Sequence, residues 1–413
     1  MNKLFTNAKQ VFNEYPRAFW TYNIIVFIDR LGGFMLYPFF ALYLTQRFEI
    51  GMADVGIIFA LFSASGFVGS ALGGALTDRM GRKGVIVASL ILSSLSALGM
   101  GLAPTLTLFV AISVIVGTLA SIGGPAHEAV VADLLPEEKR AEGYGIIRVV
   151  FNVAVIVAPP IAGLLIAHSY LTLFIVDAVI SLIAASIVFF ALPETKPQGD
   201  PNAVPETMGE TFKGYGRVFR DVPFVLFVSV TIMMTLVYMN MNSTLGVFLR
   251  DYRGLPEVGY GWLLSINAVI VVLFQFWLTR RMEKQKPLLM MALGTFLYAI
   301  GFAMYALTGG FGLFVSAMLV ITVGEMVVAP FQQALVASFA PEDMRGRYMA
   351  VSGLTWGIAF AIGPYFAGLI LDSPNPNMLW IISGAIGLLA TAGFLGLHKL
   401  HNPVIEVEAV AGD

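Results

Sequence analysis

Twelve long apolar stretches run through this 413-residue chain and constrain its fold more than any other feature. A spanning helix needs roughly 20 mostly apolar residues, whereas the strands of a membrane barrel alternate over about 10. With 58% hydrophobic and only 12% charged residues, the composition excludes a water-soluble enzyme, a secreted disulfide scaffold and a nucleic-acid binder. We therefore expect an all-α membrane protein with helices near residues 19–45, 55–76, 85–102, 106–131, 143–167, 171–192, 224–249, 257–279, 288–307, 311–337, 348–371 and 379–397.

Lysine and arginine are unevenly divided between the loops that join these stretches. Of the 24 cations, nineteen fall on one side, the other side carries only Arg47, Arg250 and Arg253, and Arg30 and Arg148 lie inside the stretches. Cytoplasmic loops of membrane proteins are enriched in Lys and Arg. The bias predicts that both termini are cytoplasmic, and it supports twelve spans, because one missed span would scramble it.

The second half of the chain repeats the first at an offset of 205 residues, which aligns Pro125 with Pro330 and Pro159 with Pro364. An even number of spans separates the copies, which predicts a parallel repeat about an axis normal to the membrane. Such a repeat places a binding site between the two halves near the bilayer midplane, which suits alternating access; the alternative is an ancestral duplication with no present mechanistic meaning. We expect one six-helix bundle over 1–192, a cytoplasmic linker over 193–222 and a second six-helix bundle over 223–413.

The loop after the second stretch reads G-A-L-T-D-R-M-G-R-K, from Gly74 to Lys83. This string resembles the signature G-x-x-x-D-R-x-G-R-K of the major facilitator superfamily and matches it at every fixed position. The string from Gly324 to Asp372 is similar to bacterial multidrug-efflux members of the twelve-span drug and proton antiporter group. The resemblance covers essentially the whole chain and implies a monomeric transporter in a bacterial inner membrane.

The resemblance also implies that this loop acts in gating. Gly74 would allow close helix packing, and Asp78 would face a helix N-terminus in the other half. In related antiporters an aspartate and an arginine of the signature pair with an acid at the end of span four, and Asp78, Arg82 and Asp133 match those positions here. The alternative is that these cations simply follow the positive-inside rule. The gating candidates are Gly74, Asp78, Arg79, Gly81, Arg82, Lys83 and Asp133.

Span five is similar to the antiporter signature g-x-x-x-G-P-x-x-G-G, with alanine in place of three of its glycines. Small residues and proline, here Pro159 and Gly163, allow tight, kinked packing that could seal one side of the transporter. The same spacing occurs in packed helices of no special function. Ser113 stands near where drug antiporters carry an arginine in span four, which leaves the coupling mechanism open.

Several charged residues fall inside the spans, where each costs about 2.5 to 3.5 kcal/mol on insertion scales and is a functional candidate. Glu325 has no cation near it in the sequence, so we expect it to bind and release the coupling proton; a structural carboxyl is the alternative. Asp29 beside Arg30 predicts an ion pair that couples transport, orients the substrate or only packs. Glu128 is a further proton-coupling candidate, unless it merely meets water at its end of span four.

The resemblance implies that spans one, four, seven and ten line a central cavity. Polar residues recur along one helical face of span seven, and two glutamines follow Glu325 by seven and eight positions. Asp177 in span six is a weaker candidate, because that span is not expected to line the cavity. The expected substrate-cavity residues are Asn23, Thr235, Tyr238, Asn242, Gln332 and Gln333.

These features predict a secondary transporter that exports amphipathic or cationic drug-like compounds in exchange for protons by alternating access. The alternatives are proton-coupled uptake of a small metabolite, transport of a lipid and, remotely, an intramembrane enzyme. The chain has no Walker-type G-x-x-x-x-G-K-[ST] string and no cysteine, and its four histidines form no metal motif. We therefore expect no cofactor and no nucleic-acid partner, only membrane lipid, protons and a small-molecule substrate.

Overall fold

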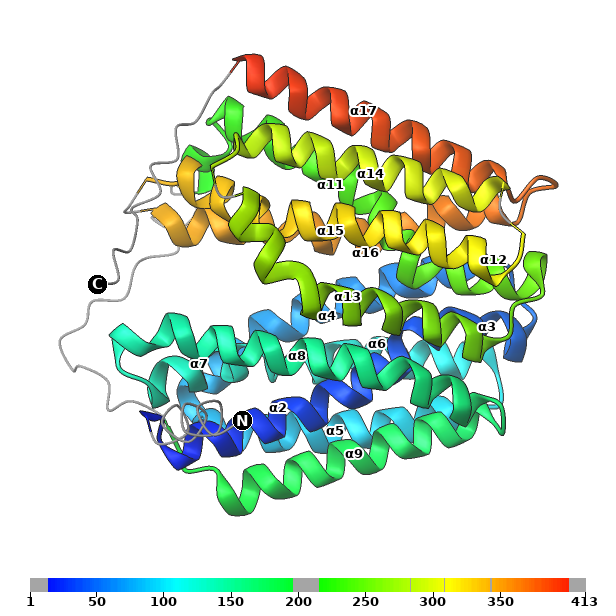
Figure 1. Cartoon of the computed structure of the whole chain (residues 1–413). Helices are drawn as coiled ribbons and strands as arrows, with labels where there is room; N and C mark the ends of the chain where they lie inside the picture. Colours follow the sequence, from blue (N-terminus) through cyan, green and yellow to red (C-terminus); the bar gives the residue numbers. More distant parts are fainter. Residues whose placement is uncertain (1–13, 196–214, 283, 308, 342–343, 401–413) are drawn as a thin grey trace, which may run out of the picture. The chain divides into compact units, whose positions relative to one another are not determined.

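A computed structural model describes residues 14–195, 215–282, 284–307, 309–341 and 344–400. These residues form helices joined by short loops, and no strand occurs among them (Figure 1). The elements are α2 (Arg17–Leu36), η1 (Tyr37–Phe39), α3 (Phe40–Phe48), α4 (Met52–Met80), α5 (Arg82–Leu102), α6 (Leu106–Ser121), α7 (Gly124–Leu134), α8 (Glu137–Ile166), α9 (Tyr170–Ala191), α11 (Val222–Ser243), α12 (Leu245–Arg253), α13 (Glu257–Met282), α14 (Pro287–Leu307), α15 (Phe311–Phe339), α16 (Arg345–Leu371) and α17 (Met378–Leu400).

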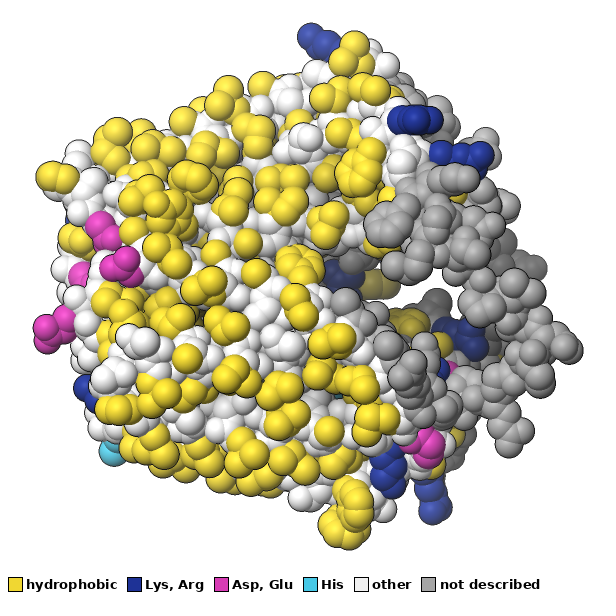
Figure 2. Space-filling view, turned by 180° about the vertical axis from the view of Figure 1, so that it is seen from behind, with side chains coloured by type: hydrophobic (Ala, Val, Ile, Leu, Met, Phe, Trp, Pro, Cys, Tyr) yellow, Lys and Arg dark blue, Asp and Glu magenta, His cyan; other side chains and the backbone are white. Residues whose placement is uncertain are grey.

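Within the described residues, twelve helical segments are long and apolar enough to cross a membrane, which confirms the predicted all-helical, twelve-span fold. The first span, Arg17–Phe48, combines α2, η1 and α3. Its short 3₁₀ turn contains Pro38, which has no backbone N–H to continue the α-helical hydrogen bonds. Large apolar side chains cover the helices, and most charged side chains lie near the helix ends (Figure 2).

The helix boundaries follow from local chemistry. Thr105 caps α6, because its hydroxyl accepts a hydrogen bond from the backbone N–H of Leu108 at 3.3 Å. Ser169 caps α9 in the same way through the N–H of Leu171 at 3.1 Å. Gly81 separates α4 from α5 with a φ of 88°, a backbone conformation that glycine adopts without steric cost.

Contacts between helices divide the chain into two compact units. Unit 1 comprises Met1–Pro201 with Asn242–Val269, and unit 2 comprises Asn202–Met241 with Ile270–Asp413. In unit 1, α2 packs against α8 and α9, α5 against α6 and α9, and α12 against α3. In unit 2, α14 packs against α15 and α17. The predicted boundary of the two bundles at the 193–222 linker stays a prediction.

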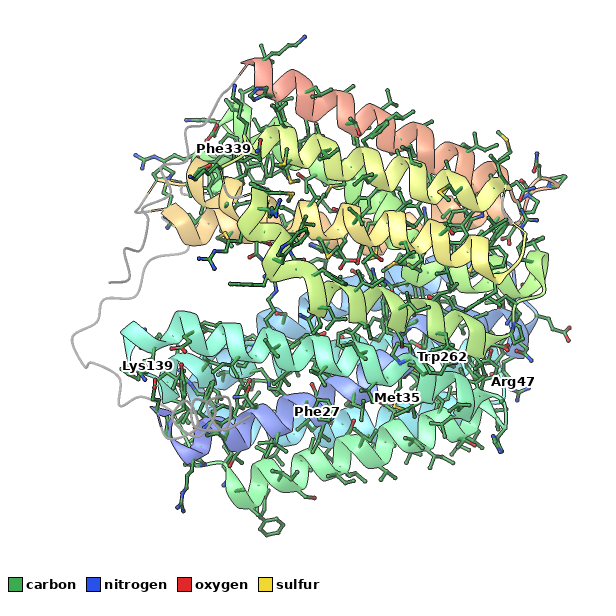
Figure 3. All side chains as sticks on the ribbon, in the orientation of Figure 1. Phe27, Met35, Arg47, Lys139, Trp262 and Phe339 are labelled. Atoms are coloured by element: carbon green, nitrogen blue, oxygen red, sulfur yellow. The ribbon has the colours of Figure 1, made fainter. Side chains whose placement is uncertain are left out.

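The cation-rich and the cation-poor side of the sequence lie at opposite ends of unit 1. Lys139, near the start of α8, and Arg47, near the end of α3, lie at opposite ends of the unit (Figure 3). Lys139 belongs to the cation-rich side of the sequence and Arg47 to the cation-poor side. The helices of unit 1 therefore separate the two groups of loops, as spanning helices must.

Candidate functional site

Two neighbouring charges lie in the middle of α2, within the first span. The Nε atom of Arg30 is 3.7 Å from the Oδ2 atom of Asp29, and the two side chains are 42% and 25% exposed. The guanidinium of Arg30 also lies over the ring of Phe151 on α8, 4.6 Å from its centroid. Attraction between a cation and an aromatic face stabilises this position. The predicted ion pair is present, and its role in coupling stays a prediction.

A second carboxyl of unit 1 lies closer to this pair than the sequence analysis anticipated. Asp177 on α9 is 7% exposed and interacts electrostatically with Asp29. Its carboxylate contacts Gly32 of α2, where a Cβ atom would overlap Oδ1 and lie 3.5 Å from Cγ. Span six was expected to lie away from the cavity, and only the packing of α9 on α2 brings Asp177 to Asp29.

His127 on α7 joins the same polar region. The hydroxyl of Tyr22 donates a hydrogen bond to the backbone carbonyl of His127 at 2.7 Å and lies 3.1 Å from its Nδ1. Since that hydroxyl has a single proton, which it gives to the carbonyl, Nδ1 can act as a donor to the hydroxyl oxygen in the form of the ring that carries a proton on Nδ1. His127 also interacts electrostatically with Asp29 and Arg30. Tyr22 was not among the predicted site residues, and His127 was considered only as the neighbour of Glu128 in the sequence.

Asn23 lies on α2, within the first span, and is 5% exposed. Its side-chain amide donates to the carbonyl of Phe19 at 2.8 Å. Its Oδ1 atom is buried and has no hydrogen-bond partner among the residues that the structure describes. Buried acceptors are normally paired because an unpaired one is energetically costly. The Oδ1 atom of Asn23 is therefore available to a hydrogen-bond donor.

In unit 2, Glu325 lies on α15 near Tyr298, which belongs to a group of three aromatic residues. Glu325 is half-buried and interacts electrostatically with Tyr298 of α14. The ring of Tyr238 on α11 lies 5.3 Å from that of Tyr298 and 5.7 Å from that of Trp356 on α16, which it meets edge to face. We call Tyr238, Tyr298 and Trp356 the aromatic cluster. Trp356 is 47% exposed, so the cluster has an accessible side.

The remaining predicted cavity residues differ in how accessible they are. Thr235 is 2% exposed, and its hydroxyl donates to the carbonyl of Thr231 at 2.8 Å, so it is already used within α11. Asn242 and Gln332 are half-buried, and Gln333 is exposed. Contact of these side chains with a substrate stays a prediction.

The signature loop between α4 and α5 is held by two acidic residues. Arg82 donates from Nε to Oδ2 of Asp133 at 3.0 Å and from Nη1 to the carbonyl of Thr77 at 3.3 Å. The hydroxyl of Thr195 donates to the same Asp133 oxygen at 3.2 Å. Glu194, which the sequence analysis missed, accepts a hydrogen bond from the backbone N–H of Arg82 at 2.8 Å. These contacts connect the start of α5, the end of α7 and the segment after α9.

The other signature residues can be placed only in part. The Nζ atom of Lys83 lies 5.7 Å from the ring centroid of Phe189. Gly81 lies against the Glu194 carboxylate, which a side chain at this position would displace. The side-chain environments of Gly74, Asp78, Arg79 and Glu128 lie outside the described part of the structure, so their predicted roles stay predictions.

Pro159 and Gly163 of α8 lie where this helix meets the first part of α13, within unit 1. A Cβ atom on Gly163 would lie 2.8 Å from the Cα atom of Val258. A Cβ atom on Gly261 would lie 2.6 Å from the carbonyl oxygen of Pro159. The hydroxyl of Ser265 donates to the carbonyl of Ile156 at 2.8 Å. The two backbones approach this closely because small residues line the contact.

Arg250 on α12 binds the end of α3, also within unit 1. Its guanidinium donates to the carbonyl of Leu42 and to the hydroxyl of Thr45, both at 2.9 Å, and pairs with Asp251 at 2.6 Å. Burial by itself lowers the pKa of Arg250, but its hydrogen bond to Asp251 and the charge of that carboxylate raise the pKa overall. Sequence analysis noted Arg250 only as one of three cations on the cation-poor side.

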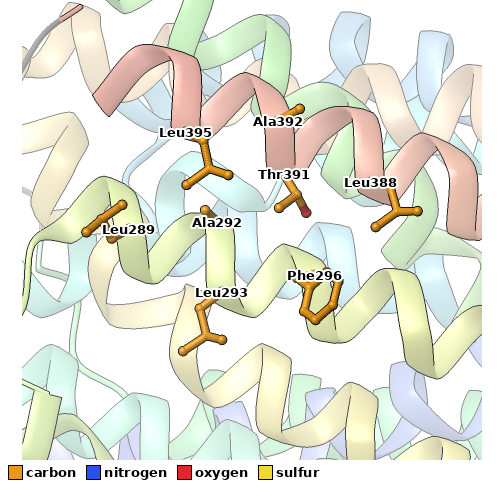
Figure 4. Close-up of a pocket in the computed structure, with 8 residues that line it drawn as sticks. All are labelled: Leu289, Ala292, Leu293, Phe296, Leu388, Thr391, Ala392 and Leu395. Carbon is orange, nitrogen blue, oxygen red and sulfur yellow. The ribbon is translucent and has the colours of Figure 1, made fainter. Parts of the chain in front are cut away.

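A pocket of about 510 Å³ lies between α14 and α17 (Figure 4). Its walls are almost wholly apolar, and the only polar side chain among its lining residues is Thr391. None of the predicted site residues lines it. The pocket is therefore separate from the polar groups around Glu325.

Within the described residues, twelve helices long enough and apolar enough to cross a membrane, with ionisable residues inside them, are typical of an integral membrane protein of the transporter class. The sequence matches the Major Facilitator Superfamily over residues 22–364, and the chain belongs to this family. The protein is a transporter rather than an enzyme, as its family and its curated relatives are.

Curated relatives cover nearly the whole chain at low identity. A Na(+), Li(+), K(+)/H(+) antiporter of Planococcus maritimus is 28% identical over 411 residues, covering 91% of this chain and 94% of that protein. The multidrug resistance protein MdtH of Shigella flexneri is 24% identical over 372 residues, covering 87% and 88%. A crystal structure of a mutant of the nucleoside transporter NupG superposes with a TM-score of 0.79 at 13% identity, covering 92% of this chain and all of that one. The structural likeness shows the fold alone.

Proposed function

We propose that this protein is a proton-coupled antiporter that exports amphipathic organic cations from the bacterial cytoplasm by alternating access. The interaction of Glu325 with Tyr298, one member of the aromatic cluster, is the observation that carries the proposal. A carboxylate attracts a positive charge, and aromatic faces bind organic cations with about 0.5–2 kcal/mol each. A site of this composition favours a flat or quaternary cation over an anion or a sugar.

Competition for Glu325 supplies a mechanism of exchange. A carboxylate that binds a proton loses its charge and with it the attraction for a cationic substrate, so proton and substrate exclude each other. If the transporter changes conformation only when either the proton or the substrate is bound, it exchanges the two across the membrane. The membrane potential adds about 2.3 kcal/mol per 100 mV for each net charge moved.

The relative from Planococcus maritimus supports a second candidate, the exchange of monovalent metal ions for protons, since its name describes that activity. Carboxylate oxygens would bind such ions, whereas an aromatic cluster is not needed for them. The two candidates share the proton and differ in the exported cation.

The test is proton movement in proteoliposomes that contain the purified protein and an internal pH dye. Tetraphenylphosphonium, ethidium, NaCl, KCl and LiCl are added separately under an imposed pH gradient. Proton flux triggered by the organic cations and lost in Glu325→Gln would support the proposal. The control is Glu49→Gln, because Glu49 is exposed in the loop after α3.

Flux triggered only by the metal ions would support the second candidate. No flux with any cation, in protein that still binds tetraphenylphosphonium, would contradict both and favour uptake or lipid transport. We also propose that the protein acts as a monomer and consists of two six-helix bundles. Both termini would lie in the cytoplasm, as the distribution of cations predicts.

A further inference from the structure

Asp177 is a buried carboxyl group for which the proposed mechanism has no use. It lies in the first half of α9, is 7% exposed and accepts no hydrogen bond from any described residue. An ionised carboxylate in that position is energetically unfavourable, because a charged group in an apolar environment needs a counter-ion or hydrogen-bond donors. A spanning helix that retains such a residue therefore points to a function for it.

The packing of α9 against α2 directs this carboxyl at the first span. Asp177 lies against Gly32, where the missing side chain leaves room for the carboxylate. Gly32 follows Asp29 by three positions, so the two residues lie on the same face of α2, about one turn apart. The electrostatic interaction between Asp177 and Asp29 agrees with this placement.

The surrounding charges do not neutralise Asp177. Arg30 is paired with Asp29 at 3.7 Å and stacked on Phe151, so its charge is directed at these two groups. His127 on α7 is hydrogen-bonded to Tyr22 and interacts with Asp29 and Arg30. Of the other helices packed against α9, α5 carries its charges at its first two positions, and Arg148 of α8 is exposed.

We propose that Asp29 and Asp177 form a proton-binding pair between α2 and α9. Gly32 has no side chain and so leaves the space in which the two carboxyls approach each other. The inference rests on the proposed proton coupling and adds a second proton site, in unit 1, to Glu325. Two carboxyls near each other in a low-dielectric region cannot both ionise cheaply, so the pair retains one proton. The pair binds that proton from water on one side of the membrane and releases it to water on the other.

A proton fits the pair better than a multivalent metal ion does. No cluster of three or more His, Cys, Asp or Glu that could hold a metal occurs among the residues covered by the structure. Two carboxylates alone are few ligands for a divalent ion. A monovalent ion such as Na⁺ has the same charge as a proton, and the experiment distinguishes the two.

The experiment measures the carboxylic-acid C=O stretching band in infrared spectra of the full-length protein in lipid at neutral pH. We expect part of this band to be lost in Asp177→Asn and kept in Asp54→Asn, since Asp54 is an exposed residue in the first turn of α4. An unchanged band in folded Asp177→Asn would overturn the proposal. Loss of the wild-type band in NaCl, but not in N-methylglucamine chloride, would overturn it in favour of a metal-ion site.

Two neighbouring glycines give a second test that keeps both carboxyls. Gly32→Ala places a methyl group against the Asp177 carboxylate, whereas a Cβ on Gly33 meets nothing within 4 Å. We expect at least a tenfold loss of substrate-driven proton flux in Gly32→Ala and Asp177→Asn, and wild-type flux in Gly33→Ala. Equal flux in the two glycine variants would contradict the pair. If the wild type shows no flux, the proposed function fails, and the infrared band still decides whether the pair binds a proton.

Discussion

Arg82 and Asp133 form a largely buried ion pair, in which Nε and Oδ2 are 3.0 Å apart and each side chain is 12% exposed. The pair joins the start of α5 to the end of α7 and involves the second arginine of the signature loop. Lys139 and Glu14 form a pair of the same length, but their side chains are 35% and 50% exposed. The two pairs allow the effect of burial to be separated from that of distance.

We expect Asp133→Asn to destabilise the protein by about 1.5–3 kcal/mol, the range for a hydrogen bond to a charged group, because it removes the charge that Arg82 pairs with. Glu14→Gln should cost at most about 1 kcal/mol, since exposed ion pairs contribute little. The measurement is the thermal unfolding midpoint in detergent, together with cation-driven proton flux. Equal midpoints for the two variants would show that the buried pair does not hold the signature loop.

The second prediction concerns the close packing of α8 against α13. In Gly163→Ala, the new methyl group would lie 2.8 Å from the Cα atom of Val258, so a backbone must shift. We expect a loss of about 1–3 kcal/mol, as is typical of overpacking. Gly145→Ala on the same helix meets nothing within 4 Å and should be neutral or slightly stabilising, because alanine favours helix. Thermal unfolding of both variants checks the difference, and a Gly163→Ala variant as stable as Gly145→Ala would contradict the tight contact.

The aromatic cluster gives the third prediction. Trp356→Ala removes a ring that meets Tyr238 edge to face at 5.7 Å, and we expect affinity for tetraphenylphosphonium to fall about 2- to 30-fold, the equivalent of 0.5–2 kcal/mol. Trp277→Ala is the control, since Trp277 on α13 is also exposed but lies outside the cluster. Equilibrium binding in detergent measures both. A comparable loss in the control would indicate that any exposed tryptophan has this effect.

The contact of α12 with α3 gives the fourth prediction. Arg250 donates to the carbonyl of Leu42 and to the hydroxyl of Thr45, so Arg250→Ala should free α12 from α3. The chain has no cysteine, and spin labels can be attached at Cys introduced for Gln46 and Tyr252, which are both exposed. We expect a broader distance distribution in Arg250→Ala than in Arg47→Ala, because the Arg47 side chain lies near Phe48 of its own helix. A distribution as narrow as in the control would mean that apolar packing alone holds α12.

The sequence by itself determined the twelve spans, the family and the charged residues inside the membrane. Each of these is a local property: a helix that satisfies its own backbone hydrogen bonds needs only a sufficient apolar length, and the signature is a continuous string. The pairing of Asp29 with Arg30 was likewise predictable, because the two residues are adjacent.

Apart from the pairing of Arg82 with Asp133, which the resemblance implied, only the tertiary structure decided which distant residues meet. Asp177 reaches Asp29 because α9 packs on the Gly32 face of α2, and Glu194 reaches Arg82 because the chain after α9 returns to the signature loop. Arg250 reaches Thr45 by the packing of α12 on α3. A hydrophobic pattern shows that a helix is buried in lipid or protein, but it does not specify the rotation and neighbours of that helix, which depend on the fit of small and large side chains along the whole contact.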